Sequence, residues 1–146
     1  MAGIHEYMTN HHLLCDDIFV HARRAAMDGD WLVTEQGCKA FLHQINRHID
    51  VEENLLFPAF EAKTGTMGGP THVMRMEHAQ LRNLFDEMLT AIDGKQAESY
   101  LLTADLVAAL LNEHNQKEEN ILYPMIDEML GPEAIKILTQ VKNILD

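Results

Sequence analysis

Residues 48–58 read HIDVEENLLFP, and residues 114–124 read HNQKEENILYP. Both stretches fit the pattern H-x-x-x-E-E-N-[LI]-L-[FY]-P, and 66 positions separate them. The same offset carries His12 onto His78 and Phe19 onto Phe85. The first part of the chain therefore resembles the second, which indicates a duplicated helical hairpin with approximate two-fold symmetry.

Helical periodicity extends on both sides of the two repeats. Leu, Met, Ala and Glu dominate the long stretches, and only four prolines occur in 146 residues. Helix-breaking sequences divide the chain into four long helices, over about 4–27 (beginning at Ile4 or Thr9), 31–63, 71–93 (with Thr71 as N-cap) and 95–129. A short helix follows Gly131-Pro132, with its apolar face made of Ile135, Leu138, Val141 and Leu145. We expect one all-α domain over residues 1–146, an up-down-up-down four-helix bundle with the C-terminal helix packed outside.

The charge and cysteine content exclude several classes of protein. The net charge is -12, and such a field repels phosphate backbones and anionic lipids, so nucleic acid and membrane are poor partners. No apolar run could span a bilayer, and the N-terminal residues do not resemble a signal peptide, so we expect a cytoplasmic protein. Cys15 and Cys38 form neither a disulfide framework nor a Cys-x-x-Cys pair.

The His and Glu residues of the repeats fall on the faces predicted to be buried. Residues four apart on a helix lie one turn apart on one face, so each pair aims an imidazole and a carboxylate at one point. One stripe contains Ile45, His48, Glu52 and Leu55, and the other contains Leu111, His114, Glu118, Ile121 and Met125. The helix between them has a stripe of Met74, His78, Leu81, Phe85 and Met88.

Buried carboxylates without counter-charges indicate a metal site. Removing Glu52 and Glu118 from water costs several kcal/mol unless each is protonated, paired or coordinated, and no Lys or Arg shares either stripe. The repeat adds two more imidazoles. Because the offset carries His12 onto His78 but His11 onto Glu77, we take His12 as the ligand and place His11 at the helix flank. The predicted ligands are His12, His48, Glu52, His78, His114 and Glu118.

This set of nitrogen and oxygen ligands fits two metal ions better than one. With two bridging glutamates and one bridging oxygen, two octahedral ions would keep about one open position each. Such a shell without thiolate suits iron, with manganese and zinc as alternatives.

The neighbouring residues have simpler interpretations. Glu53 and Glu119 lie about 100° round the helix from Glu52 and Glu118, so they are expected behind the ligands or in solvent, although they are the first substitutes as ligands. Cys15 is interpreted as packing and Tyr123 as an anchor of a helix end. His5 is interpreted as a half-exposed terminal histidine, with a place at the pocket entrance as the alternative. His21, His43 and His72 are interpreted as structural or surface residues.

These motifs resemble the hemerythrin-like, or HHE cation-binding, family, whose signature is a His on helices one and three and H-x-x-x-E on helices two and four. The resemblance covers the chain to about Met129 and implies a non-haem di-iron centre bridged by the two glutamates. The oxygen-carrying members have a second His four residues before the His of helix three, where this chain has Met74. Their fourth-helix carboxylate lies five residues after its His, which here is Glu119.

These departures move the expected function away from simple oxygen carriage. The four-His, two-Glu set is similar to bacterial di-iron proteins linked to nitric oxide stress and iron-sulfur repair. We therefore expect a di-iron protein that binds dioxygen, nitric oxide or peroxide for sensing, scavenging or repair. The alternatives are an iron-storage or iron-delivery module and an enzyme that consumes peroxide or nitric oxide. The sequence identifies no redox partner and no oligomeric state.

Overall fold

The computed structural model describes residues 3–146, and these form a bundle of helices. The helices are α1 (Ile4–Met27), α2 (Trp31–Val51), α3 (Phe57–Thr64), α4 (Pro70–Asp93), α5 (Ala97–Lys117), α6 (Tyr123–Leu130) and α7 (Glu133–Leu145). Two π-helical turns, η1 (Glu52–Leu56) and η2 (Glu118–Leu122), join α2 to α3 and α5 to α6. The predicted all-α four-helix bundle is confirmed.

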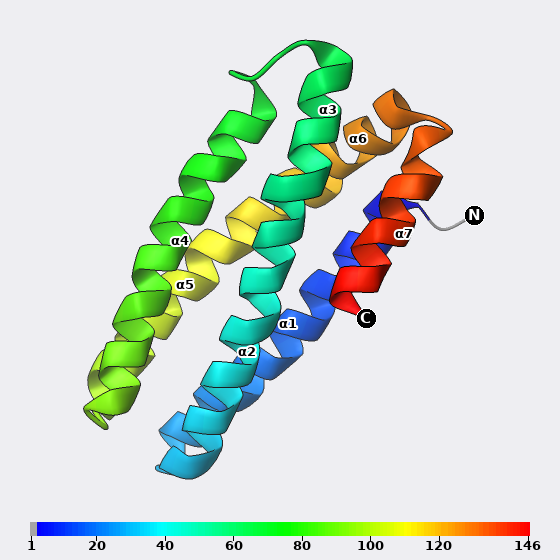
Figure 1. Cartoon of the computed structure of the whole chain (residues 1–146). Helices are drawn as coiled ribbons and strands as arrows, with labels where there is room; N and C mark the ends of the chain where they lie inside the picture. The colour runs from blue at the N-terminus through cyan, green and yellow to red at the C-terminus, as the bar shows by residue number, and fades with distance from the viewer. Residues whose placement is uncertain (1–2) are drawn as a thin grey trace.

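Two hairpins pack against each other to make the bundle. Figure 1 shows α1 beside α2 and α4 beside α5, while α3 and α6 continue the second helix of each hairpin. Helix α7 lies outside the four long helices and packs on α2 and α6. The hairpin arrangement agrees with the duplication inferred from the repeat.

Each π turn inserts one extra residue into a long helix. A π turn pairs each N–H with the carbonyl five residues earlier, and in η1 the N–H of Phe57 donates to the carbonyl of Glu52. Pro58 and Pro124 are the second residues after the turns, in the first turns of α3 and α6. Proline in a helix interior clashes with the carbonyl four residues before it. The π turns therefore let both long helices continue through a proline.

The extra residue moves the core positions beyond each π turn. The prediction of a core position was wrong for three residues: Ile121 is 56% exposed, Met125 is 36% exposed and Leu55 is only partly buried. Each is replaced in the core by the residue that follows it, namely Leu122, Ile126 and Leu56. The prediction assumed an uninterrupted α-helical period of 3.6 residues.

Some smaller details also differ. Helix α4 begins at Pro70 rather than Thr71, as expected from the preference for proline in the first helical position, and the Thr71 hydroxyl instead donates to Glu61 at 2.7 Å. Helix α5 begins at Ala97 rather than Lys95, because Lys95 has a φ of 52°, outside the helical region. Ile135 is exposed, whereas the other three apolar residues predicted to pack α7 are buried.

The core has two apolar parts with a polar layer between them. One part contains Phe41, Phe85 and Tyr100, and the other contains Phe57, Tyr123 and Ile126 at the end covered by α7. The predicted stripe on α4 is confirmed, since all five of its residues are buried. The His and Glu residues of the repeats lie in the polar layer.

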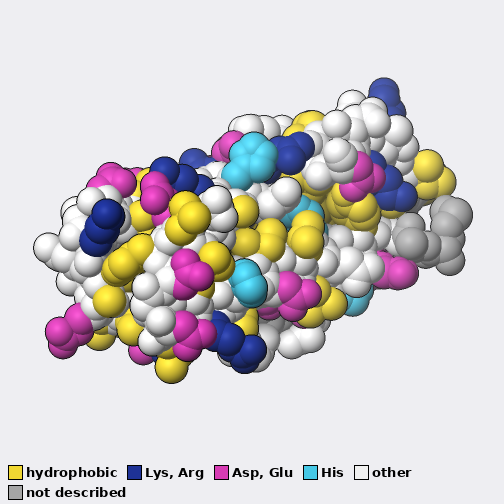
Figure 2. All heavy atoms as spheres, turned by 90° about the horizontal axis from the view of Figure 1, so that it is seen from below, with side chains coloured by type: hydrophobic (Ala, Val, Ile, Leu, Met, Phe, Trp, Pro, Cys, Tyr) yellow, Lys and Arg dark blue, Asp and Glu magenta, His cyan; other side chains and the backbone are white. Residues whose placement is uncertain are grey.

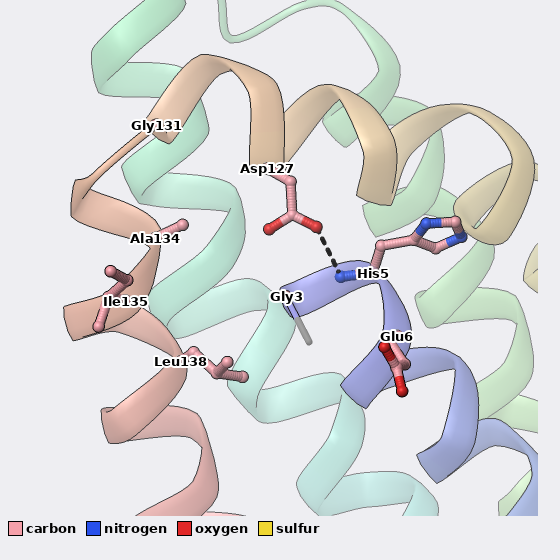
Figure 3. A pocket seen from close by; sticks show the side chains of 8 residues that line it. All are labelled: Gly3, His5, Glu6, Asp127, Gly131, Ala134, Ile135 and Leu138. Atoms are coloured by element: carbon pink, nitrogen blue, oxygen red, sulfur yellow. Dashed lines mark hydrogen bonds between the residues drawn. The ribbon is translucent and has the colours of Figure 1, made fainter. Parts of the chain in front are cut away.

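Asp127 fastens the first helix to α6. Its carboxylate accepts hydrogen bonds from the backbone N–H groups of Ile4 at 3.0 Å and His5 at 2.9 Å, which would otherwise lack a partner at a helix start. Figure 3 shows this contact beside a surface cavity of about 440 Å³ between α1, α6 and α7. His5 lines that cavity, which agrees with its interpretation as a partly exposed terminal residue.

The surface is mixed in character. On the face shown in Figure 2, acidic side chains are interspersed with basic and apolar ones. Between residues 3 and 146 no helix has both the length and the apolar character needed to cross a bilayer.

Candidate metal centre

The structure brings the six predicted ligands together in the middle of the bundle. They form two groups, and the potential ligand atoms within each group lie within 4.8 Å of one another. One group adds His12 and His48 to Glu52 and Glu118, and the other adds His78 and His114 to the same two glutamates. We call them the His12/His48 group and the His78/His114 group. All six side chains are at most 2% exposed.

The helix pattern explains this convergence. His12 and His78 come from α1 and α4, whereas each H-x-x-x-E pair begins at the end of α2 or α5 and finishes in the adjoining π turn. The four-residue spacing places both members of a pair on the inner face. The two pairs then meet across the bundle, and Glu52 and Glu118 lie between the two groups.

Several buried atoms in the centre make no hydrogen bond. These are Glu52 Oε1, Glu118 Oε2 and His78 Nε2; the first and third lie 3.1 Å apart without forming one. In the described part of the chain, every ion pair of Glu52 and Glu118 is with a histidine, and none is with Lys or Arg. Leaving such groups unsatisfied is costly. The donor set therefore fits divalent metal ions that bind nitrogen and oxygen ligands.

Each of the four central histidines has a partner behind it. A hydrogen bond at Nδ1 fixes the ring so that Nε2 faces the centre, an arrangement common among metal-binding histidines. The Nδ1 partners are Glu119 for His12 (2.7 Å), Glu53 for His78 (2.7 Å), Glu77 for His114 (2.8 Å) and His11 for His48 (2.8 Å). Glu53 and Glu119 thus lie behind the histidines, one of the two places expected for them.

The placement of His11 at the helix flank was wrong. His11 is 7% exposed and its Nε2 lies 3.2 Å from Gln44 Oε1. Helix α1 packs against both α2 and α6, so two adjacent positions about 100° apart are both buried. His11 faces α2, while His12 reaches Glu118 in η2. The repeat already aligned His11 with Glu77, and both residues turn out to support a central histidine.

Tyr123 lies at the centre rather than only anchoring a helix end. Its hydroxyl donates to Glu52 Oε2 at 2.6 Å and lies 3.1 Å from Glu118 Oε1. It is also 3.2 Å from the Nε2 atoms of both His12 and His48. This role was not predicted from the sequence. The repeat did show one difference between its halves, since Tyr123 aligns with Phe57, which has no hydroxyl. Phe57 stacks on His78 with ring centroids 5.8 Å apart.

The carboxylates raise the pKa of three central histidines. Burial opposes the charged form of His114, but Glu118 and Glu52 outweigh it and raise its pKa. Burial opposes the charged form of His12, but hydrogen bonds to Glu118 and Glu119 outweigh it and raise the pKa of His12 to about 10. Burial opposes the charged form of His78 in the same way, and Glu52 and Glu53 raise its pKa to about 9. Burial instead lowers the pKa of His48. Pairing with the glutamates thus favours the protonated form of His12 and His78 when no metal is bound.

We predict that the metal-free protein loses stability as the pH rises from about 7 to 8.5. The unfolded histidines release their protons near pH 6.5, whereas folded His12 and His78 keep theirs up to about pH 10 and 9. Their stabilisation is therefore complete below pH 6.5 and decreases above it, by up to about 1.4 kcal/mol per pH unit for each histidine. Urea unfolding at several pH values, with a chelator present, measures this.

A matched variant controls the pH experiment. Glu119→Gln removes one of the carboxylates that raise the pKa of His12, so the decline should be smaller in this variant. Cys15 and Cys38 titrate in the unfolded state near the upper end of this range in both proteins, so the difference between the two declines isolates the contribution of His12. A stability that stays constant or increases over this range would contradict the prediction.

The surface histidines, Cys15 and Met74 lie where the sequence predicted them. His21, His43 and His72 are exposed, and Cys15 and Met74 are buried in the two apolar parts of the core. A surface hollow of about 250 Å³, lined by Glu53, Arg75, His78, Ala79 and Arg82, reaches the flank of His78.

Comparison with known proteins gives one clear result. The model of the hemerythrin HHE cation-binding domain matches residues 2–126 of the chain. Neither the curated proteins nor the solved structures gave a significant match. The matched region contains all six residues of the two groups and both π turns. The chain therefore belongs to the hemerythrin HHE cation-binding domain family.

Proposed function

We propose that this protein is a non-haem di-iron protein. His12 and His48 would bind one iron ion, His78 and His114 the other, and Glu52 and Glu118 would bridge the two. The observation that supports this most directly is that the two groups share both glutamates. A single ion would leave two of the four buried imidazoles without a metal to coordinate.

The chemistry of the donors favours iron. Four imidazole nitrogens and two carboxylates form an N/O set, and neither group includes a cysteine; the Cys15 thiol lies 3.8 Å from His11 Nδ1. Such sets suit iron, and manganese and zinc are the alternatives. The carboxylates behind three of the histidines increase the donor strength of these rings and fix their orientation.

We further propose that the centre binds dioxygen, nitric oxide or peroxide in sensing, scavenging or repair. A bound iron pair with an open position on each ion would supply redox-active binding of such a ligand. The chain restricts the ligand to small molecules, because all six residues are buried and the nearest surface hollow is small. Tyr123 offers a hydroxyl donor inside the centre, and Phe57 and Met74 belong to the apolar core beside it.

The experiment that tests this function counts metal and records spectra. The protein is prepared without oxygen, loaded with ferrous iron, desalted, and exposed to dioxygen and then nitric oxide. We expect about two irons per chain and a reversible change in the visible spectrum on ligand binding. Easily chelated iron without a spectral response would favour storage or delivery instead. Sustained consumption of peroxide or nitric oxide would favour the enzyme alternative.

A further inference from the structure

The two groups differ in the partner behind one of their histidines. In the His78/His114 group, both rings have a carboxylate at Nδ1, from Glu53 and Glu77. In the His12/His48 group, His12 has Glu119, but His48 has the imidazole of His11. His11 in turn has Gln44 as its partner. The two halves of the repeat thus differ at this aligned position, where the first half has His11 and the second half has Glu77.

This departure makes His48 the weaker donor. A neutral His48 that binds metal through Nε2 carries its proton on Nδ1 and donates it to His11 Nδ1, 2.8 Å away, while His11 Nε2–H donates to Gln44. A neutral imidazole is a weaker acceptor than a carboxylate. Glu77 also pairs with Lys117 at 2.6 Å, yet it still accepts from His114 as an ion. Loss of such a carboxylate partner typically lowers metal affinity 10- to 100-fold.

The hydroxyl of Tyr123 is a second and independent difference. It lies within 3.2 Å of one donor atom from each member of the His12/His48 group. A metal ion entering there must disrupt the hydrogen bond to Glu52. Two of the atoms that make no hydrogen bond, His78 Nε2 and Glu52 Oε1, face each other at 3.1 Å in the His78/His114 group, where Phe57 aligns with Tyr123. An ion entering that group does not have to displace a tyrosine hydroxyl, because Phe57 has none.

We propose that the two metal positions fill in order, the His78/His114 position first and the His12/His48 position second. The inference rests on the proposed di-iron function and adds that the second ion is the weaker and more exchangeable one. Loss of the second ion alone would leave a one-iron form without the paired centre. The residues that set the order are His11 and Tyr123, both acting through other side chains as positioning residues.

The test is an anaerobic calorimetric titration of the metal-free protein with ferrous iron. We expect two steps, with the first ion bound at least about tenfold more tightly. Single variants assign the steps to positions. His114→Ala should remove the tight step, and His48→Ala should remove the weak step. Removal of the tight step by His48→Ala would overturn the order, and so would two steps of equal affinity in the unaltered protein.

Exchange of the two repeat-related residues tests the cause. His11→Glu should tighten the second step about tenfold, and Glu77→His should weaken the first step by a similar factor. Tyr123→Phe, which copies Phe57, should also tighten the second step. Circular dichroism checks that each variant folds, and Tyr123→Phe provides a test if His11→Glu does not fold. An unchanged or weaker second step in a folded Tyr123→Phe or His11→Glu protein counts against the proposal.

The outcomes separate this inference from the proposed function. Absence of stoichiometric iron binding would overturn both the di-iron function and the filling order. Binding of two ions with equal affinity would overturn the order alone and leave the di-iron function standing. The calorimetric readout requires no activity, so the physiological ligand need not be known.

Discussion

Replacing either Glu52 or Glu118 by glutamine should abolish stable binding of both iron ions. Each carboxylate belongs to both groups, so one substitution removes an anionic ligand from each ion. Glutamine keeps the volume but not the charge. Iron per chain after desalting, together with the visible spectrum, measures the effect. Retention of two ions per chain in Glu52→Gln would refute the bridging role.

The matched controls are the glutamates that directly follow the bridging residues. Glu53→Gln and Glu119→Gln remove the carboxylates behind His78 and His12, so iron should still bind, with affinity lower by about 10- to 100-fold. The pairs 52/53 and 118/119 thus compare neighbouring residues in the same π turn. Equal losses in both members of a pair would show that the substitutions act on the fold rather than on the ligands.

Stability of the metal-free variants provides a second readout. Glu52 and Glu118 are fully buried and pair with His78 and His12 in the metal-free protein. Loss of one carboxylate leaves a buried imidazolium without its partner, so the glutamine variants should unfold at a lower urea concentration than the unaltered metal-free protein. Circular dichroism without urea checks that each variant is folded, and loss of iron from a folded variant places the effect at the metal centre.

The fold and the six central positions were predictable from the sequence for one reason. The repeat of 66 positions relates two hairpins, so each inferred position supported another. Helical period and helix-breaking residues gave the long helices to within a few residues. The choice of His12 over His11 also rested on the repeat, and the structure places His12 in a group while His11 lies behind His48.

The missed features depend on tertiary packing. The pattern gave no measure of how much of the α1 surface faces neighbours, so His11 was assigned to the flank although it is buried. Glu77 was noted only as the repeat partner of His11, and its contact with His114 depends on how α4 packs on α5. Tyr123 was assigned by its position near a helix end, but the π turn directs its hydroxyl into the centre.

The π turns themselves have no signature in the hydrophobic period alone. They become visible only when the core spacing is compared on both sides of the turn. Leu56, Phe57 and Phe60 are buried and lie four, five and eight residues after Glu52. An uninterrupted α-helix would favour spacings of about three, four and seven. The extra residue in η1 accounts for the difference.

Deletion of Asn54 should therefore leave the bundle folded, whereas deletion of His43 should unfold it. Both residues are exposed, but Asn54 lies in η1 and His43 lies within α2. Deleting Asn54 moves Leu56, Phe57 and Phe60 to regular α-helical spacing from Glu52, so both parts of the helix keep their buried faces. Deleting His43 rotates one part of α2 by about 100° relative to the other and removes its side chains from the core.

The Asn54 deletion still has a cost, because a regular helix would place Pro58 in its interior. We expect about 3 kcal/mol of destabilisation, which addition of Pro58→Ala should largely restore. Circular dichroism and urea unfolding compare the two deletions and the combined variant. A His43 deletion as stable as the Asn54 deletion would show that register beyond η1 does not determine the fold. Recovery on removal of Pro58 would show that η1 allows a proline in the first turn of α3.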